Sequence, residues 1–220
     1  MAHKVREMLV QQRTQLLNSL RGHLAEVGVI AAQGATNGRA LAALIEAKHE
    51  EVPAPVTAAL MPLVQQLHIL DAAIDKADKE MAQAAKACSQ AKLLMSIPGI
   101  GPTTATALIA TIGKSGIKQF SGPREFAAFL GLVPRQNSSG GKERLGRITK
   151  MGNQYIRKLL VVGAHAVLHH VAKHSDPLRN WGKALLAAKP FKLAAVATAN
   201  KMARLVYAIL AAQKPYRVAA

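Results

Sequence analysis

Apolar residues recur every three or four positions along most of the chain, which is the spacing of one face of a helix. In residues 4–27 the pattern runs through Leu9, Leu16 and Leu20, and Gly28 follows as a C-terminal cap. Further helices are predicted over residues 39–49, 103–112, 124–130, 153–173, 175–188 and 191–212. Residues 134–152 are rich in glycine and lack an apolar period, so they are expected to form a loop or at most a short hairpin.

The most regular apolar stripe lies in the long helix predicted over residues 60–88. Its members follow one another at alternating spacings of three and four: Leu60, Leu63, Leu67, Leu70, Ile74, Ala77, Met81, Ala84 and Cys88. A heptad kept over four repeats is typical of a coiled-coil seam. We expect residues 60–88 to mediate a homodimer or a higher oligomer, although the stripe can instead pack on residues 4–27 of the same chain. Cys88, at a seam position, is expected in the core.

The character of the chain changes at Ile97, and a domain boundary is expected just before it. Residues 1–91 are predicted to form a helical connector with a coiled coil, and residues 92–220 a compact helical domain. Within Leu94–Ile109, a turn between two predicted helices favours a helix-hairpin-helix. Gly99 and Gly101 would let backbone N–H groups of the helix opened by Thr103 face a phosphate. An ordinary glycine-proline corner is the alternative.

Composition supports an all-α protein, because half of the 220 residues are hydrophobic, chiefly Ala, Leu and Val, and 4% are aromatic. A single cysteine allows no internal disulfide, as expected in a reducing compartment. The longest charge-free runs, residues 52–70 and 93–113, are broken by prolines, so no membrane partner is expected. We expect a cytoplasmic, nucleoid-associated protein.

The net charge of +17 indicates a polyanionic partner, and its distribution shows where that partner binds. Residues 1–80 carry a net charge of −1, whereas residues 81–220 carry +18. The densest run contains the candidate DNA-binding cations, with Glu143 as the one acidic residue among them: Arg135, Lys142, Arg144, Arg147, Lys150, Arg157 and Lys158. In a glycine-rich segment such cations can follow a phosphodiester backbone.

Ser138 and Ser139 precede Gly140 and Gly141 inside this basic run. A serine hydroxyl on a flexible backbone, with cations nearby to stabilise charge on phosphorus, is a candidate nucleophile. The residues alone favour the plainer interpretation, a solvated linker.

Three segments of the sequence carry a family resemblance. They are IPGIGPTTATALIATIG, GLVPRQNSSGGKERLGRITKMGNQYIRKLLVVGA and KPFKLAAVATANKMARLVYAIL. Together they closely resemble the C-terminal domain of insertion-sequence transposases of the IS116/IS110/IS902 type. The opening VREMLVQQRTQLLNSLRGHLAEVGVIAAQG resembles the helical connector that precedes that domain, so the resemblance covers essentially the whole chain.

The resemblance implies a DNA recombinase with a composite active site. An N-terminal RuvC-like domain would hold divalent metal on four acidic residues, the C-terminal domain would supply a serine that attacks DNA, and a structured guide RNA would choose the target. By position the serine falls on Ser139, with Ser138 as the neighbouring candidate. The RuvC-like domain is expected upstream of Val5, and we expect this chain to lack it. The chain alone would then be nearly inert, with no metal or cofactor of its own and Mg²⁺ only on a RuvC-like partner.

Other interpretations remain open on the residues. Asp71, Asp75 and Asp78 share a helical face, and His165, His169, His170 and His174 include two i, i+4 pairs. The carboxylates are expected to be solvated, and the histidines buried or facing phosphate rather than binding zinc. Functionally, the C-terminal part of a serine-using transposase competes with a non-enzymatic nucleic-acid-binding module or remnant. A structural RNA-binding protein of the ribosomal kind also fits the charge.

Overall fold

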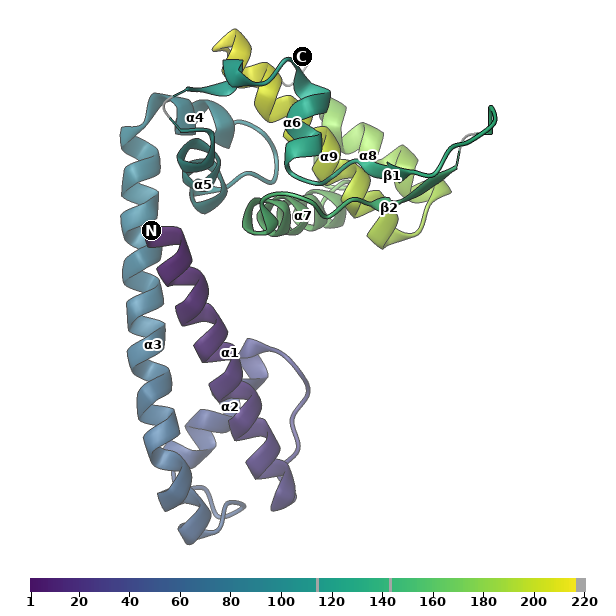
Figure 1. Cartoon of the computed structure of the whole chain (residues 1–220). Coiled ribbons are helices and arrows are strands. Elements are labelled where there is room, and N and C mark those ends of the chain that lie inside the picture. The colour runs from purple at the N-terminus through teal and green to yellow at the C-terminus, as the bar shows by residue number, and fades with distance from the viewer. Residues whose placement is uncertain (114, 143, 217–220) are drawn as a thin grey trace. The chain divides into compact units, whose positions relative to one another are not determined.

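The computed structural model describes residues 1–113, 115–142 and 144–216 (Figure 1). Its elements in chain order are α1 (Ala2–Glu26), α2 (Ala35–Glu46), α3 (Ala54–Ala87), α4 (Ser89–Met95), α5 (Pro102–Ile112), the short 3₁₀ turn η1 (Ile117–Gln119), α6 (Pro123–Phe129), β1 (Pro134–Gln136), β2 (Leu145–Ile148), α7 (Gln154–His169), α8 (Pro177–Ala188) and α9 (Phe191–Ala212). Helices dominate the described chain, and its strands form one two-stranded antiparallel hairpin. The prediction of an essentially all-α protein is confirmed.

The chain divides into two compact units, which we call unit 1 (Met1–Glu80) and unit 2 (Met81–Ala220). The helix α3 contributes its first 27 residues to unit 1 and its last turns to unit 2. The domain boundary expected after residue 91 remains a prediction.

Unit 1 is built from α1, α2 and most of α3 around an aliphatic core. Leu20, Leu24, Ile45 and Leu67 are almost completely buried in this core. The helices α1 and α2 approach closely because Gly38 has no Cβ, which would otherwise lie 2.9 Å from the Leu17 side chain.

The heptad stripe of α3 is already covered within unit 1. Leu67, Leu70 and Ile74 are each at most 4% exposed. Two ion pairs join α1 to α3 beside the stripe, from Arg6 to Asp78 and from Arg13 to Asp71. The stripe therefore packs within the chain, which is the alternative that its pattern left open, and association of two chains through it remains a prediction.

Unit 2 is arranged around α9, which contacts α4, α6, α7 and α8 (Figure 1). Its inward face consists mainly of small residues such as Ala195, Ala199 and Ala203, all fully buried, so neighbouring helices come close. The helix α9 is also long and apolar enough to cross a membrane, but half of its most apolar window is buried inside the protein, as in the core helix of a globular unit.

Candidate nucleic-acid interface

The strands β1 and β2 form a hairpin that extends from the helices of unit 2 (Figure 1). Gln136 pairs with Leu145, and the N–H of Asn137 donates to the carbonyl oxygen of Arg144 at 2.8 Å. At the tip, Gly140 and Gly141 both have positive φ, 57° and 76°. Positive φ at both central residues is the requirement of a type I′ turn, which matches the twist of a hairpin. The glycine pair therefore forms a tight, defined turn rather than a linker.

The two candidate serines occupy different positions in this hairpin. The hydroxyl of Ser138 accepts the N–H of Arg144 at 3.1 Å, so Ser138 is engaged in holding the two strands together. Ser139 is exposed at the tip and pairs across the turn with Lys142, whose N–H donates to the Ser139 carbonyl at 3.1 Å. Among the described residues, no hydrogen-bond partner is found for the Ser139 hydroxyl. Residues paired across a hairpin project to the same face, so the side chain of Lys142 lies on the side of Ser139.

The candidate cations of the basic run have different surroundings. Lys142 and Arg144 are exposed on the hairpin, and Lys158 is exposed on α7. The Arg135 guanidinium donates to the carbonyl of Thr149 at the base of the hairpin at 3.4 Å. Arg157 is half-buried, and one of its guanidinium nitrogens donates to the carbonyls of residues 130 and 151 at 3.0 and 3.1 Å. Arg157 therefore anchors the segment that leads from the hairpin into α7. Glu143 lies outside the described residues.

The turn between α4 and α5 contains the predicted hairpin glycines, and their roles differ. A Cβ on Gly99 would lie 2.6 Å from the carbonyl oxygen of Gly163 in α7, so Gly99 serves the packing of this turn on α7. Gly101 is exposed in extended backbone at the start of α5, and a Cβ there would meet nothing within 4 Å. Thr103 follows, half-buried in the first turn of α5. Of the two glycines, Gly101 is thus the one that leaves its backbone open to a ligand.

A groove with a volume of about 1110 Å³ runs between the hairpin and α9, and we call it the α9 groove. Its lining includes apolar residues of α9 such as Leu193, Val196 and Leu205, with Trp181 of α8. Five cations line it, namely Arg147, Lys150, Lys192, Lys201 and Arg204, and none of the lining residues is acidic. The basic run supplies Arg147 and Lys150, whereas the other three cations were missed by the sequence analysis. The available signal was that Lys201 and Arg204, three residues apart, share a face of a predicted helix.

Two interactions fix the geometry of the α9 groove. The amide nitrogen of Asn200 donates to the carbonyl of Leu132 at 2.9 Å, joining α9 to the segment before the hairpin. The ammonium group of Lys201 lies 4.3 Å from the ring centroid of Trp181. Burial, followed by the nearby charge of Arg204, lowers the pKa of Lys201. This ammonium group is therefore partly desolvated, which strengthens its interaction with any anion that enters.

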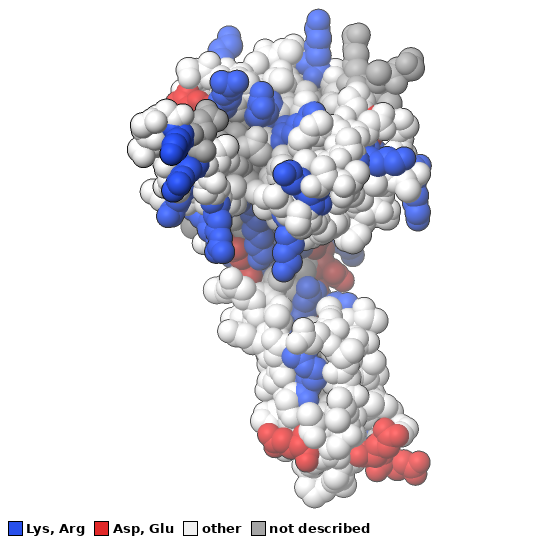
Figure 2. Space-filling model, turned by 90° about the vertical axis from the view of Figure 1, so that its right-hand side faces the viewer, with Lys and Arg blue, Asp and Glu red and all other residues white. Residues whose placement is uncertain are grey.

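Cations dominate the surface of unit 2. Figure 2 shows Lys and Arg spread over one face of it, with few acidic side chains among them. Of the acidic residues that the structure describes there, Asp176 is buried and ion-paired with Arg179, and Glu125 accepts hydrogen bonds from Ser121. The positive charge is thus little compensated locally.

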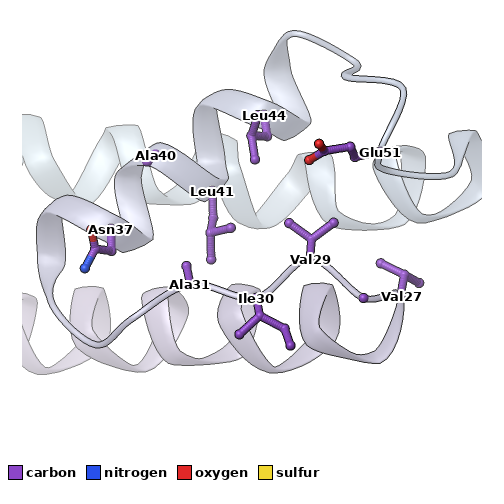
Figure 3. A pocket seen from close by; sticks show the side chains of 10 residues that line it. Val27, Val29, Ile30, Ala31, Asn37, Ala40, Leu41, Leu44 and Glu51 are labelled. Atoms are coloured by element: carbon purple, nitrogen blue, oxygen red, sulfur yellow. The ribbon is translucent and has the colours of Figure 1, made fainter.

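A second pocket, of about 620 Å³, lies within unit 1 (Figure 3). Leu41 and Leu44 of α2 point toward the segment that contains Val29 and Ala31, and Glu51 lies at one end. None of the predicted site residues lines it.

Two of the three aspartates and two of the four histidines considered from the sequence have partners in the structure. Asp71 accepts hydrogen bonds from Arg39 and Arg13, and the bond from Arg39 is the main cause that lowers the pKa of Asp71. His165 and His169 both pack against the ring of Phe191. Over the described ranges, no three His, Cys, Asp or Glu side chains lie close enough to hold a metal ion. The residues here therefore do not fit a Mg²⁺ site, and no step through a metal is assigned to them.

Comparison with known proteins identifies the part of the chain that carries this hairpin. Residues 91–179 match the model of the transposase IS116/IS110/IS902 family. This part of the chain is therefore similar to the transposases of this family. The matched residues include the α4–α5 turn, the hairpin with both serines, and α7, whereas α9 lies beyond them. The family resemblance drawn from the sequence is confirmed.

Individual transposases extend the similarity over nearly the whole chain. A probable family 20 transposase of Pseudomonas aeruginosa is 39% identical over 98% of this chain and 64% of its own length. The transposase for insertion sequence element IS1111A of Coxiella burnetii is 40% identical over 99% of this chain and 59% of its own length. The transposase for insertion sequence element IS1328 of Yersinia enterocolitica is 32% identical over 94% of this chain and 61% of its own length. The chain thus spans about three fifths of the length of these relatives.

Proposed function

We propose that this chain is the DNA-binding, serine-supplying part of a transposase, with Ser139 as the nucleophile. The observation that supports this most is the position of Ser139 at an exposed hairpin tip, opposite Lys142, in a segment that matches a transposase family. Its hydroxyl is not engaged by the described residues, whereas the hydroxyl of Ser138 accepts a backbone N–H. Ser138 is then a positioning residue that keeps the hairpin in register.

The proposed reaction is a transesterification at a DNA phosphate. The Ser139 oxygen forms a bond to phosphorus and loses its proton, and one ester bond between phosphorus and a deoxyribose oxygen breaks. That deoxyribose oxygen takes up a proton and leaves as a hydroxyl, so the protein becomes covalently joined to the other DNA end. Lys142 offsets the charge that develops on the phosphate oxygens.

We infer that the base that accepts the serine proton comes from another chain or domain, because none of the described hairpin residues is acidic or a histidine. A serine hydroxyl is a weak nucleophile at neutral pH and needs such a base. The exposed tip leaves room for a second domain to reach the same phosphate. We propose a RuvC-like partner with its Mg²⁺ for this role, as the family resemblance implies, and a structured guide RNA as a second nucleic-acid partner.

Phosphate binding around this centre is assigned to two elements. We propose that α4, the turn at Gly101 and α5 act as a helix-hairpin-helix on the DNA backbone, and that Lys142, Arg144 and Lys158 contact neighbouring phosphates. Such contacts position DNA without reading its sequence. A DNA-acting chain of this kind is also expected at the nucleoid, and its self-association through residues 60–88 belongs to the same proposal.

The experiment is a covalent trapping assay with element-end DNA, Mg²⁺ and a supplied RuvC-like domain. We expect a protein–DNA adduct on a denaturing gel with the unaltered chain and none with Ser139→Ala. DNA affinity should stay within a few-fold, because one neutral hydroxyl contributes little beside many phosphate contacts. Ser138→Ala is the matched control and should retain the adduct, at a reduced rate.

Three outcomes would contradict the assignment. An adduct that persists in Ser139→Ala but disappears in Ser138→Ala moves the nucleophile by one residue. An adduct that persists in the double variant refutes the serine mechanism. DNA binding with no adduct under any condition supports the non-enzymatic module instead.

A further inference from the structure

The α9 groove combines an apolar surface with a cationic one, and a DNA duplex cannot cover both at once. Its floor is apolar, formed by residues such as Leu193, Val196 and Leu205, and cations line it without any acidic residue. A DNA duplex presents phosphates outward and keeps its base faces stacked inside, so it would leave the apolar floor uncovered. An unpaired strand exposes both its phosphates and its base faces. Proteins that bind single strands use this combination of a basic groove and an apolar or aromatic platform.

The position of the groove indicates which strand it meets. Its lining includes Gly146, Arg147 and Ile148, which all belong to β2, a strand of the hairpin that carries Ser139. A strand that leaves the groove past these residues would meet the same hairpin that carries Ser139. The electrostatics also favour a polyanion, because five cations line the groove and none of its lining residues is acidic.

We propose that the α9 groove binds an unpaired segment of single-stranded DNA, adjacent to the phosphate that Ser139 attacks. Phosphates contact Arg147, Lys201 and Arg204, and bases lie on the apolar face of α9. This inference rests on the proposed function for the position of the strand, but not for its binding. Lys201 is held at its place over the Trp181 ring, so its ammonium group is positioned before DNA arrives.

Trp181 provides a direct readout, because it is the chain's one tryptophan and it lines the groove. The full chain is titrated with an oligodeoxythymidine of 15 nucleotides, which forms no base pairs. We expect the Trp181 fluorescence to change in a saturable way, with the same midpoint as the anisotropy of a labelled copy of the oligonucleotide. A self-complementary hairpin duplex should bind the chain and leave the Trp181 signal nearly unchanged.

Two variants test separately what the cations and the apolar floor of the groove contribute to binding. Lys201→Gln combined with Arg204→Gln should weaken oligodeoxythymidine binding by at least about tenfold, since each contact to a charged group contributes appreciably. It should also reduce the slope of log affinity against log salt by about 1.4, because each single-strand phosphate contact contributes about 0.7. Leu193→Ser should weaken binding several-fold with the slope unchanged, since it removes apolar contact and no charge.

The matched control for the charge variant is Lys183→Gln combined with Lys189→Gln. Both lysines are exposed on or directly after α8, and neither lines the groove. This control removes the same charge from the same unit, and we expect a loss of single-strand affinity of about twofold at most. Duplex affinity should fall by no more than about twofold in either charge variant.

Several results would overturn the proposal. Equal losses in the groove variant and in the control would show that general charge, not the groove, binds the strand. Duplex affinity that falls as far as single-strand affinity would show that the groove takes a duplex. Tight binding of an oligouridine with no binding of oligodeoxythymidine would assign the groove to RNA. Because these are binding measurements, they stand whether or not Ser139 forms an adduct.

Discussion

At the residue scale, two glycines of one turn have opposite requirements. Gly99 has a φ of 84°, and its Cα lies against the backbone of Gly163 in α7. Gly101 has extended backbone and open space where a Cβ would point. In the sequence the two glycines lie close together in one turn, which suggested that both serve phosphate binding. The structure instead separates a packing position from an exposed one.

This contrast predicts different effects for two substitutions. Gly99→Ala should lower the free energy of unfolding by about 2 kcal/mol or more, because the added Cβ is strained at positive φ and overlaps the Gly163 carbonyl. Gly101→Val should cost less than about 1 kcal/mol, the scale of a changed N-cap, yet it should weaken binding to all DNA sequences alike by blocking backbone approach. Urea unfolding and DNA anisotropy measure the two effects.

The same two substitutions can also contradict the proposed helix-hairpin-helix. If Gly101→Val binds DNA like the unaltered chain while its stability is intact, then the N-terminus of α5 does not contact phosphate. If Gly99→Ala retains full stability, the close packing of this turn on α7 is wrong.

At the scale of elements, the long helix α3 illustrates how much a hydrophobic period determines. The heptad spacing correctly predicts that Leu67, Leu70 and Ile74 face an apolar partner. It does not identify the partner, because a stripe on α1 of the same chain and a second copy of α3 satisfy the same period. The ion pairs from Arg6 and Arg13 to α3, which join residues 58 or more positions apart, cannot be predicted from local spacing.

Two isoleucine substitutions on α3 test the partner. Ile74→Asp places a charge at a site that is 3% exposed, so unit 1 should lose about 3 kcal/mol or more of stability. Ile69→Asp, on the same helix at 62% exposure, is the matched control and should leave stability within about 0.5 kcal/mol. Circular dichroism on heating and sedimentation velocity give stability and mass.

Sedimentation also decides the question of self-association. An oligomer that dissociates in Ile74→Asp while α3 stays folded would restore the seam as the interface between chains. An oligomer that dissociates in Ile69→Asp alone would place the interface on the outer face of α3.

The structure of the basic segment, residues 134–152, was the hardest to predict from the sequence. Its glycines and serines fit a linker as well as a hairpin, and the family resemblance left two serines as candidates. The distinction depends on Gly140 and Gly141 taking positive φ together, which sets the register and pairs Ser139 with Lys142. A strand of three or four residues carries too little alternation for this register to be read from its pattern.

At the scale of the whole molecule, charge is the property that the sequence predicts best. The excess of basic residues over 81–220 coincides with unit 2. The α9 groove was not predicted, because its lining residues range from Pro123 to Ala208 and meet only in the folded unit. The positions of helices follow from the local spacing of apolar residues. A site assembled from residues across an 86-residue stretch depends instead on how the helices are arranged in space.

The charge of unit 2 predicts a steep dependence of duplex DNA affinity on salt. With about five phosphate contacts, log affinity should fall with a slope near −4.5 against log salt, or several hundredfold between 50 and 200 mM. Arg144→Gln should reduce this slope by about 1 on two unrelated DNA sequences alike. Fluorescence anisotropy at four or more salt concentrations gives the slopes. A slope shallower than about −1 would contradict binding through phosphates.

The central place of α9 in unit 2 also sets an order in time. Residues such as Ala199, Met202 and Val206 fill the middle of the core, and they follow every other helix of the unit along the chain. A chain emerging from the ribosome exposes its N-terminal part first. The helices of unit 1 can therefore close around their own core early in translation, whereas the hairpin with Ser139 leaves the ribosome before the helix that supports it. The nascent protein acquires the complete unit 2, to which we assign DNA binding, only after α9 has been synthesised, so polypeptides released before that point should bind DNA poorly.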